Sequence, residues 1–124
     1  MYTLDADLVD DLGGVVGDGL RTVATYDRGE YELQFIREDV GADYTDSEIA
    51  NVYEQVEIEG MGYDHFEELF HVGDLECAMY GFESALMFQF PRDSFTGLFI
   101  TVDRDVTINP DAVISVCTRA MGLE

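Results

Sequence analysis

The two histidines and two cysteines are the side chains of this sequence whose chemistry is most readily recognised. His65, His71 and Cys77 follow one another at intervals of six residues, and Cys117 lies far downstream. Residues six positions apart point to opposite sides of a helix, so the two histidines would not converge on one ion there. Neither His-Glu-x-x-His nor Cys-x-x-Cys is present, and these are common zinc-binding spacings. We therefore predict no metal site, with His65 exposed and His71 near the C-terminus of a short helix.

Lysine is absent, and all six basic residues are arginine. Walker-type phosphate loops and Schiff-base catalysis both need a lysine amine, so both are excluded. The glycine-rich segment 13–19 closes a predicted helix, whereas a dinucleotide-binding loop follows a strand and opens a helix. Acidic pairs such as Glu67–Glu68 diverge on a helix and are weak evidence for acid–base catalysis. Ser84 and Ser94 lack the flanking glycines of a hydrolase nucleophile. We expect no catalytic residue, no cofactor and no enzymatic activity.

Acidic residues dominate the charge. The chain has 27 Asp and Glu against six Arg, which gives a formal net charge of −21 over 124 residues. Like charges at this density repel and destabilise the compact state, whereas molar salt shrinks the Debye length to about 3 Å. We therefore expect a protein of a high-salt cytoplasm, as in haloarchaea. The alternative is an acidic protein that binds cations or basic partners.

The charge also restricts partners and location. Without a basic stripe, binding to nucleic acids or anionic membranes is disfavoured. The segment Met1–Asp11 carries four aspartates and no positive charge, unlike a signal peptide. No apolar run approaches the roughly 18 residues of a membrane-spanning helix. We expect a cytoplasmic protein whose cysteines, Cys77 and Cys117, are free buried thiols rather than a disulfide.

Length and hydrophobic periodicity predict one domain over residues 1–124. Apolar residues at helical spacing predict four helices, over residues 3–20, 45–58, 64–70 and 110–122. Alternating apolar residues predict five strands, over residues 22–26, 31–36, 75–82, 85–90 and 97–102. Residues 41–44 are expected to form a loop. The order α-β-β-α-(α)-β-β-β-α predicts an α+β fold: one five-stranded antiparallel sheet with flanking helices.

Local signals refine these elements. The first helix is capped by Thr3 or Asp5, and its glycines either end it early or allow close packing against the sheet. Thr45 begins a capping box, and Asn109 caps the last helix ahead of a proline. On the strand over 31–36, Tyr31, Leu33 and Phe35 are expected to share one buried face. The strand over 85–90 is apolar on both faces and is expected to be central.

Two apolar faces have more than one use. The helix over 45–58 and the strand over 75–82 are each expected to pack in the core by default. The alternative is a homodimer seam made by this helix and an edge strand, because an exposed apolar strand needs a partner. The possible dimer or partner surface consists of Ile49, Val52, Tyr53, Val56, Leu75, Cys77 and Met79.

Three segments carry a family resemblance. The hairpin over residues 19–29 with its Asp-Arg-Gly turn, the run Phe82–Phe90, and the stretch Leu98–Asn109 are similar to the dynein light-chain roadblock family, which has a profilin-like fold. The chain departs from that family in its many central aromatic residues and in the extra helix over 64–70. The resemblance implies a non-catalytic homodimer that serves as a platform for a Ras-like small GTPase or a signalling partner. The chain also resembles small acidic haloarchaeal proteins of unassigned function.

A second hypothesis comes from the aromatic residues. A small-molecule sensor related to PAS or GAF domains would need an aromatic pocket. Its candidate lining is Tyr80, Phe82, Phe88, Phe90 and Phe95. The two hypotheses are distinguished by whether these rings surround a cavity or fill a core.

Overall fold

The computed structural model describes residues 7–105 and 107–122. Its elements are α1 (Leu8–Val16), the short 3-10 helix η1 (Gly17–Gly19), β1 (Leu20–Asp27), β2 (Glu30–Ile36), α2 (Glu38–Asp43), α3 (Asp46–Gly60), α4 (Tyr63–Leu69), β3 (Ala78–Gly81), β4 (Ala85–Pro91), β5 (Thr96–Asp103) and α5 (Pro110–Ala120). The strands form one antiparallel sheet in the order β2-β1-β5-β4-β3. This arrangement confirms the predicted α+β fold.

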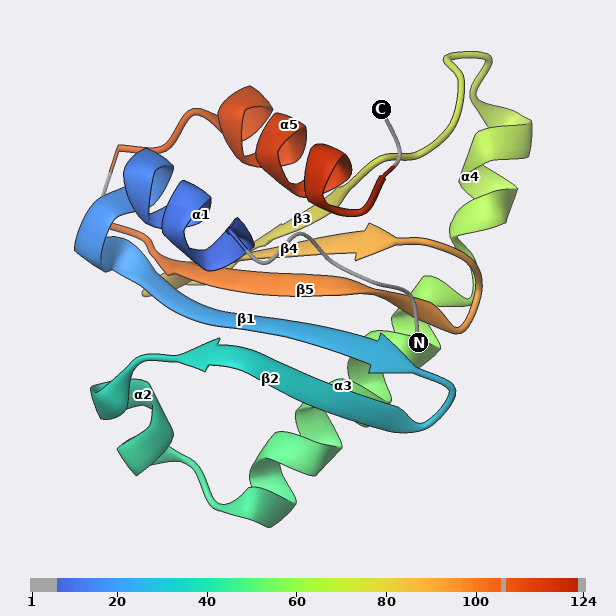
Figure 1. Cartoon of the computed structure of the whole chain (residues 1–124). Helices are drawn as coiled ribbons and strands as arrows, with labels where there is room; N and C mark the ends of the chain where they lie inside the picture. Colours follow the sequence, from blue (N-terminus) through green and yellow to red (C-terminus); the bar gives the residue numbers. More distant parts are fainter. Residues whose placement is uncertain (1–6, 106, 123–124) are drawn as a thin grey trace.

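The sheet is covered on both faces (Figure 1). Helices α1 and α5 lie on one face, where Leu12, Val113 and Cys117 pack with strand residues such as Phe88 and Ile100, all fully buried. Helix α3 lies on the other face and contributes Tyr53 and Val56 to a smaller core. The larger core therefore holds α1 and α5 firmly, while α3 is attached through fewer apolar contacts.

Helix α1 is shorter than predicted and ends at Val16. Gly17, its C-cap, has φ +61°, a conformation that other residues rarely adopt. The predicted early end is thus confirmed. The alternative of close packing is wrong for Gly13 and Gly14, because an added Cβ at either position would meet nothing within 4 Å. The predicted caps, Thr3 and Asp5, lie outside the described residues.

Gly14→Ala should stabilise the protein. The position is exposed, helical and open, so alanine removes the entropic cost of a helical glycine without a clash. We expect the free energy of unfolding to rise by about 0.5–1 kcal/mol, measured by urea unfolding followed by circular dichroism at constant KCl. The matched control is Gly17→Ala, which should lower stability because its φ of +61° is unfavourable for alanine. A stabilising Gly17→Ala would contradict this account of the helix end.

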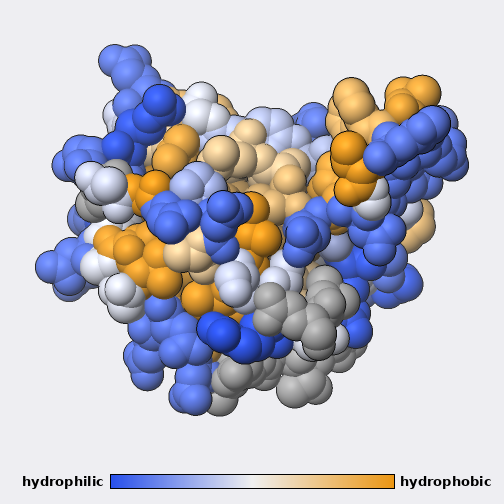
Figure 2. All heavy atoms as spheres, turned by 90° about the horizontal axis from the view of Figure 1, so that it is seen from above, coloured by the Kyte–Doolittle hydropathy of each residue, from blue (hydrophilic) through white to orange (hydrophobic). Residues whose placement is uncertain are grey.

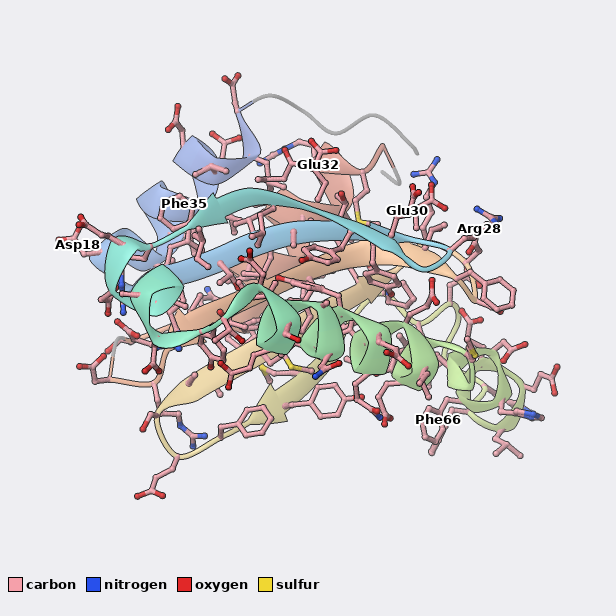
Figure 3. The ribbon with its side chains drawn as sticks, turned by 90° about the horizontal axis from the view of Figure 1, so that it is seen from below. Asp18, Arg28, Glu30, Glu32, Phe35 and Phe66 are labelled. Carbon is pink, nitrogen blue, oxygen red and sulfur yellow. The ribbon has the colours of Figure 1, made fainter. Side chains whose placement is uncertain are left out.

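The first hairpin is confirmed, with one difference of physical interest. Its turn at Arg28 and Gly29 has two positive φ angles, +46° and +89°, as a tight hairpin requires. Opposite β1, Leu33 pairs with Ala24, but Phe35 pairs with Val23. This β-bulge skips Gln34 and reverses the alternation of side chains. Phe35 therefore joins the core beneath α1 (Figure 3), and the prediction that it shares a face with Tyr31 and Leu33 is wrong.

Three other expectations are corrected. The predicted loop over 41–44 is largely helical, as α2 runs from Glu38 to Asp43. Strand β3 begins only at Ala78, so Leu75 and Cys77 precede it. β5, not β4, is the central strand. β4 is nevertheless buried on both faces at Phe88, Gln89 and Phe90, which explains its continuous apolar sequence.

The two predicted helix caps that lie within the described residues are confirmed. The Thr45 hydroxyl accepts a hydrogen bond from the Glu48 amide at 3.1 Å, and the Glu48 carboxylate accepts one from the Thr45 amide at 2.9 Å. The Asn109 side chain accepts from the Asp111 amide at 3.0 Å, ahead of Pro110. These caps fix the start of α3 and α5 and hence the orientation of both helices on the sheet.

Candidate interaction site

The first part of the candidate site is the outer edge of β3, an edge strand of the sheet. β3 carries no charged residue and has no neighbouring strand on its outer side among the described residues. Met79 on this edge is 52% exposed. The opposite edge strand, β2, carries exposed Glu30 and Glu32 (Figure 3) and the bulge at Gln34. Charges and bulges discourage strand addition, so β3 is the better edge for pairing.

A segment that we term the arm precedes this edge. It comprises residues 63–72, that is α4 and the three residues that follow it. The arm exposes four apolar side chains: Phe66 is 50% exposed, Leu69 73%, Phe70 58% and Val72 85%. Figure 2 shows hydrophobic atoms gathered on this projecting part of the molecule. A cluster of large exposed apolar side chains is typical of a binding surface.

The base of the arm is fixed to the sheet by buried hydrogen bonds. The Gln89 side-chain amide donates to the Tyr26 hydroxyl at 2.9 Å and to the Val56 carbonyl at 2.8 Å. The Tyr63 hydroxyl donates to Gln89 Oε1 at 3.1 Å and is also bonded to the Tyr80 hydroxyl. Burial raises the pKa of Tyr26 to about 12, so this phenol keeps its proton near neutral pH. The network joins β1, β3, β4, the end of α3 and the start of α4.

Gly97 makes this network possible. Gly97 pairs with Tyr26 across β1 and β5, and a Cβ at Gly97 would overlap the Tyr26 hydroxyl and lie 2.6 Å from the Phe90 carbonyl oxygen. The Tyr26 ring therefore lies over a residue without a side chain and reaches Gln89 on the next strand. Gly60 is similarly close, because a Cβ there would lie 3.1 Å from Gln89 Nε2.

An apolar groove lies on the α3 face of the sheet, at the end of β3 opposite to the arm. Its volume is about 510 Å³. The walls come from α2, the first half of α3 and the turn between β3 and β4, represented by Val40, Val52 and Phe82. The floor is the sheet, including Met87 and Thr101. Among the 16 lining residues only Glu83 and Arg21 are charged, which is unusual in a chain with 27 acids.

Two arginines, Arg37 and Arg21, form a cluster of ion pairs with aspartates beside this groove. The Arg37 guanidinium donates to the Asp103 carboxylate at 2.7 and 3.1 Å and to the Asp39 carboxylate at 2.6 and 3.1 Å. Arg21 approaches Asp103 at 3.4 Å. Hydrogen bonds from Arg37 hold the pKa of both carboxyl groups below their usual range. These bonds join the ends of β2 and β5 to α2 and so fix one wall of the groove.

The comparisons with known proteins decide the family. A family model described as a domain of unknown function, DUF7522, matches residues 6–122. The chain belongs to this family. No curated protein matches the DUF7522 chain by sequence.

Solved structures show what the DUF7522 fold resembles. A roadblock/LC7 domain from Streptomyces avermitilis superposes with a TM-score of 0.64 at 12% sequence identity. The match covers 98% of this chain and 93% of the Streptomyces avermitilis chain. An MglB structure described as having a tetrameric arrangement has a TM-score of 0.62 at 14% sequence identity. The match covers 94% of this chain and 82% of the MglB chain. MglB of Myxococcus xanthus has a TM-score of 0.55 at 13% sequence identity. The match covers 94% of this chain and 84% of the Myxococcus xanthus chain. The predicted roadblock-like fold is confirmed.

The seven predicted surface residues of the DUF7522 chain separate into three groups by exposure. Tyr53 is 6% exposed and Val56 3% exposed, because both pack against the sheet and leave no surface for a partner. Val52 and Met79 are exposed, whereas the remaining three are half-buried: Ile49, Leu75 and Cys77. The arm is not recognisable as a surface from the sequence, because the spacing of its apolar residues equals that of a helix that packs in the core.

The predicted aromatic pocket of the sensor hypothesis does not form. Phe88 and Phe90 are fully buried and stack at 6.4 Å in the core beneath α5. Phe82 and Phe95 are exposed in the turns at opposite ends of β4. Tyr80 lies at the edge of the sheet, where its hydroxyl is hydrogen-bonded to that of Tyr63 in α4. The five rings therefore do not line one cavity.

The histidines and cysteines also occupy separate places. His65 and His71 are both exposed on the arm. Cys77 and Cys117 are free thiols, the former half-buried and the latter buried, and burial raises the pKa of both thiols. Within the part of the chain that the structure describes, no three potential ligands gather to hold a metal. No helix in that part is long and apolar enough to cross a membrane.

Proposed function

We propose that this chain is a non-catalytic protein-interaction module that works as a homodimer joined across β3. The observation that carries the proposal is the uncharged outer edge of β3, with Met79 exposed. Pairing of two β3 edges extends each sheet by main-chain hydrogen bonds and covers apolar side chains. In a chain with a net charge of −21, self-association is least opposed by repulsion where both surfaces lack carboxylates, and β3 meets that condition.

The alternation of side chains restricts how two β3 strands can pair. Directly opposed residues in an antiparallel pair lie on the same face of the sheet. Met79 pairs with Phe88 and faces α5, whereas Tyr80 pairs with Met87 and faces α3. The twofold axis must therefore pass through a pair of identical residues, and the registers that overlap most of β3 place Met79 opposite Met79 or Tyr80 opposite Tyr80. Either register continues both helical layers across the dimer.

The dimer would present a platform to a protein partner in a saline cytoplasm. The roadblock resemblance implies a Ras-like small GTPase as that partner, and the tetrameric arrangement of one MglB neighbour supports self-association of the fold. The test is co-elution, in molar KCl, with small GTPases encoded in the same genome and loaded with GTP or GDP. Absence of binding in both nucleotide states would overturn the GTPase assignment without affecting the dimer.

The dimer itself has a sharper test. Multi-angle light scattering in molar KCl should give twice the mass of the chain, and Met79→Asp should give the monomer mass, because in either register each copy would bring a carboxylate into the pairing of the two uncharged strands. Phe95→Asp is the matched control, since Phe95 is 44% exposed and lies outside β3. Unchanged circular dichroism checks the fold of both variants. A monomeric parent chain, or a Met79→Asp variant that remains a dimer, would overturn the β3 seam.

A further inference from the structure

The outer edge of β3 presents the main-chain groups of alternate residues. The Phe82 amide donates to the Ala85 carbonyl at 2.8 Å, so Phe82 directs its main chain toward β4. The direction of the N–H and C=O groups alternates along a strand. Tyr80 therefore also directs its main chain toward β4, whereas Met79 and Gly81 direct theirs outward, where the described residues provide no neighbouring strand.

A hydrogen bond on the other side of β4 supports the same assignment. The Arg104 amide donates to the Ser84 carbonyl at 3.1 Å, so Ser84 directs its main chain toward β5. Alternation from Ser84 along β4 turns the main chain of Met87 toward β3. Met87 is the residue opposite Tyr80, and the two strands therefore agree on which groups are paired.

The number of main-chain hydrogen bonds distinguishes the two registers. With Tyr80 opposite Tyr80, Met79 of each copy lies opposite the partner's Gly81. Each of these two pairs exchanges two hydrogen bonds, so the seam gains four and every outward group of β3 has an acceptor or donor. With Met79 opposite Met79, Gly81 meets the partner's Cys77, which precedes β3, and only the two bonds between the Met79 residues lie within the strands.

Side chains favour the same register. Phe82 is 56% exposed at the end of β3. With Tyr80 at the axis, Phe82 lies opposite the partner's Ala78, which is small and apolar. With Met79 at the axis, continued pairing would place Phe82 opposite the partner's Glu76, an exposed acid. Packing an aromatic ring over a carboxylate removes water from the charge and is unfavourable.

Tyr80 links this seam to the base of the arm. Its hydroxyl is hydrogen-bonded to that of Tyr63, the first residue of the arm, which in turn donates to Gln89 at 3.1 Å. Tyr80 is only half-buried within one chain. In a non-hydrogen-bonded antiparallel pair, opposed Cα atoms lie about 4.5 Å apart, so the partner's Tyr80 would shield this bond from water. Hydrogen bonds are stronger when they are shielded from water.

We propose that the two copies pair with Tyr80 opposite Tyr80, and that this seam stabilises the attachment of the arm through Tyr63. The inference rests on the proposed homodimer and adds its register and the segment that it regulates. Coupling of this kind is reciprocal. Dimer formation holds the arm and its exposed apolar side chains more firmly in place, and a protein that binds the attached arm strengthens the dimer.

Disulfide cross-linking tests the register. Two proteins both carry Cys77→Ala; one adds Ala78→Cys and the other Phe82→Cys, while Cys117 is fully buried and is retained. They are mixed in molar KCl and oxidised with glutathione disulfide. With Tyr80 at the axis, positions 78 and 82 of the two copies lie about 4.5 Å apart, within the range of a disulfide. The mixture should give a cross-linked dimer, by intact mass, that neither protein gives alone.

Met79→Cys in the same Cys77→Ala background is the matched control. With Tyr80 at the axis, the two copies of position 79 are diagonal neighbours about 7–8 Å apart, beyond the usual range of a disulfide. Self-cross-linking of Met79→Cys without a 78–82 product would overturn the Tyr80 register and leave the β3 seam intact. A monomeric parent chain would overturn both proposals together.

Hydrogen exchange tests the coupling to the arm. Amides of α4 should exchange about tenfold faster in the Met79→Asp monomer than in the parent dimer, because the monomer lacks the shielded bond at Tyr63. Strand β2, at the opposite edge of the sheet, is the internal control and should exchange at the same rate in both proteins. Equal exchange of α4 in monomer and dimer would contradict the coupling without affecting the register.

Loss of one hydroxyl group gives the reciprocal measurement. Tyr63→Phe should raise the dimer dissociation constant about threefold to tenfold, although Tyr63 lies outside β3. Tyr44→Phe is the control, since Tyr44 is 39% exposed and precedes α3, and should leave the constant unchanged. Circular dichroism checks that both variants fold. An unchanged dissociation constant in Tyr63→Phe would count against the coupling.

Discussion

On dialysis from molar KCl into dilute buffer, the protein is expected to lose most of its helical circular dichroism and to regain it when KCl is restored. The cause is the formal charge of −21 on 124 residues. At about 0.01 M ionic strength the Debye length is about 30 Å, so most carboxylates of a small domain repel one another. At 1 M it is about 3 Å and only direct neighbours interact. Because α3 is attached through the smaller core, its helical signal should disappear first.

A charge variant distinguishes screening from other effects of salt. Glu30 lies directly opposite Asp27 in the first hairpin, and like charges in that position are destabilising. Glu30→Gln should therefore lower the KCl concentration at the folding midpoint. The control is Gln34→Asn, which leaves the charge unchanged. Full retention of helical signal in dilute buffer would count against the salt dependence and against the saline-cytoplasm interpretation.

Among glycine-to-alanine substitutions, Gly97→Ala is expected to lower the stability of the protein most. The new Cβ would overlap the Tyr26 hydroxyl and lie 2.6 Å from the Phe90 carbonyl oxygen. Tyr26 would have to leave Gln89, and the backbone of β4 or β5 would have to shift. Overpacking alone costs about 1–3 kcal/mol, and a buried hydrogen-bond partner left unsatisfied adds about 1–3 kcal/mol. We expect a loss of about 3 kcal/mol or more in the free energy of unfolding, measured by urea titration in molar KCl.

The comparison for this variant is Gly62→Ala. Gly62 precedes α4, has a negative φ of −104° and would place its Cβ in open space. It should change stability by a few tenths of a kcal/mol. Because the network also holds Tyr63, hydrogen exchange in α4 should accelerate in Gly97→Ala beyond the effect of lower global stability. Equal stability of the two variants would contradict the assigned role of Gly97.

The elements that the sequence predicted well are those with local determinants. The capping box at Thr45, the proline after Asn109 and the Asp-Arg-Gly turn each fix backbone geometry within a few residues. The failures arise from longer-range causes. Nothing in the alternation of β2 marks Gln34 as skipped, because the bulge depends on pairing with β1. The order of strands likewise depends on the whole sheet, and so β4 was expected at the centre, where β5 lies.

The candidate site was predictable only in part. Apolar spacing indicates which side of α3 is hydrophobic, and Tyr53 and Val56 lie on that side. This side of the helix packs against the sheet of its own chain. In α4 the same kind of spacing belongs to side chains left in solvent. Periodicity shows that a helix has an apolar face and does not show what covers it. The groove was missed because its lining comes from segments between Arg21 and Thr101 that only the fold brings together.

The two edges of the sheet have unequal chemistry, and this limits the size of any assembly. A sheet with two adhesive edges is divalent and can grow into a fibril. Here β2 carries Glu30, Glu32 and the bulge at Gln34, whereas β3 is uncharged. The molecule is therefore monovalent for strand addition. The proposed association through β3 would use the one uncharged edge strand of each copy among the described residues and would stop at two chains, even in molar salt where charge repulsion no longer prevents polymerisation.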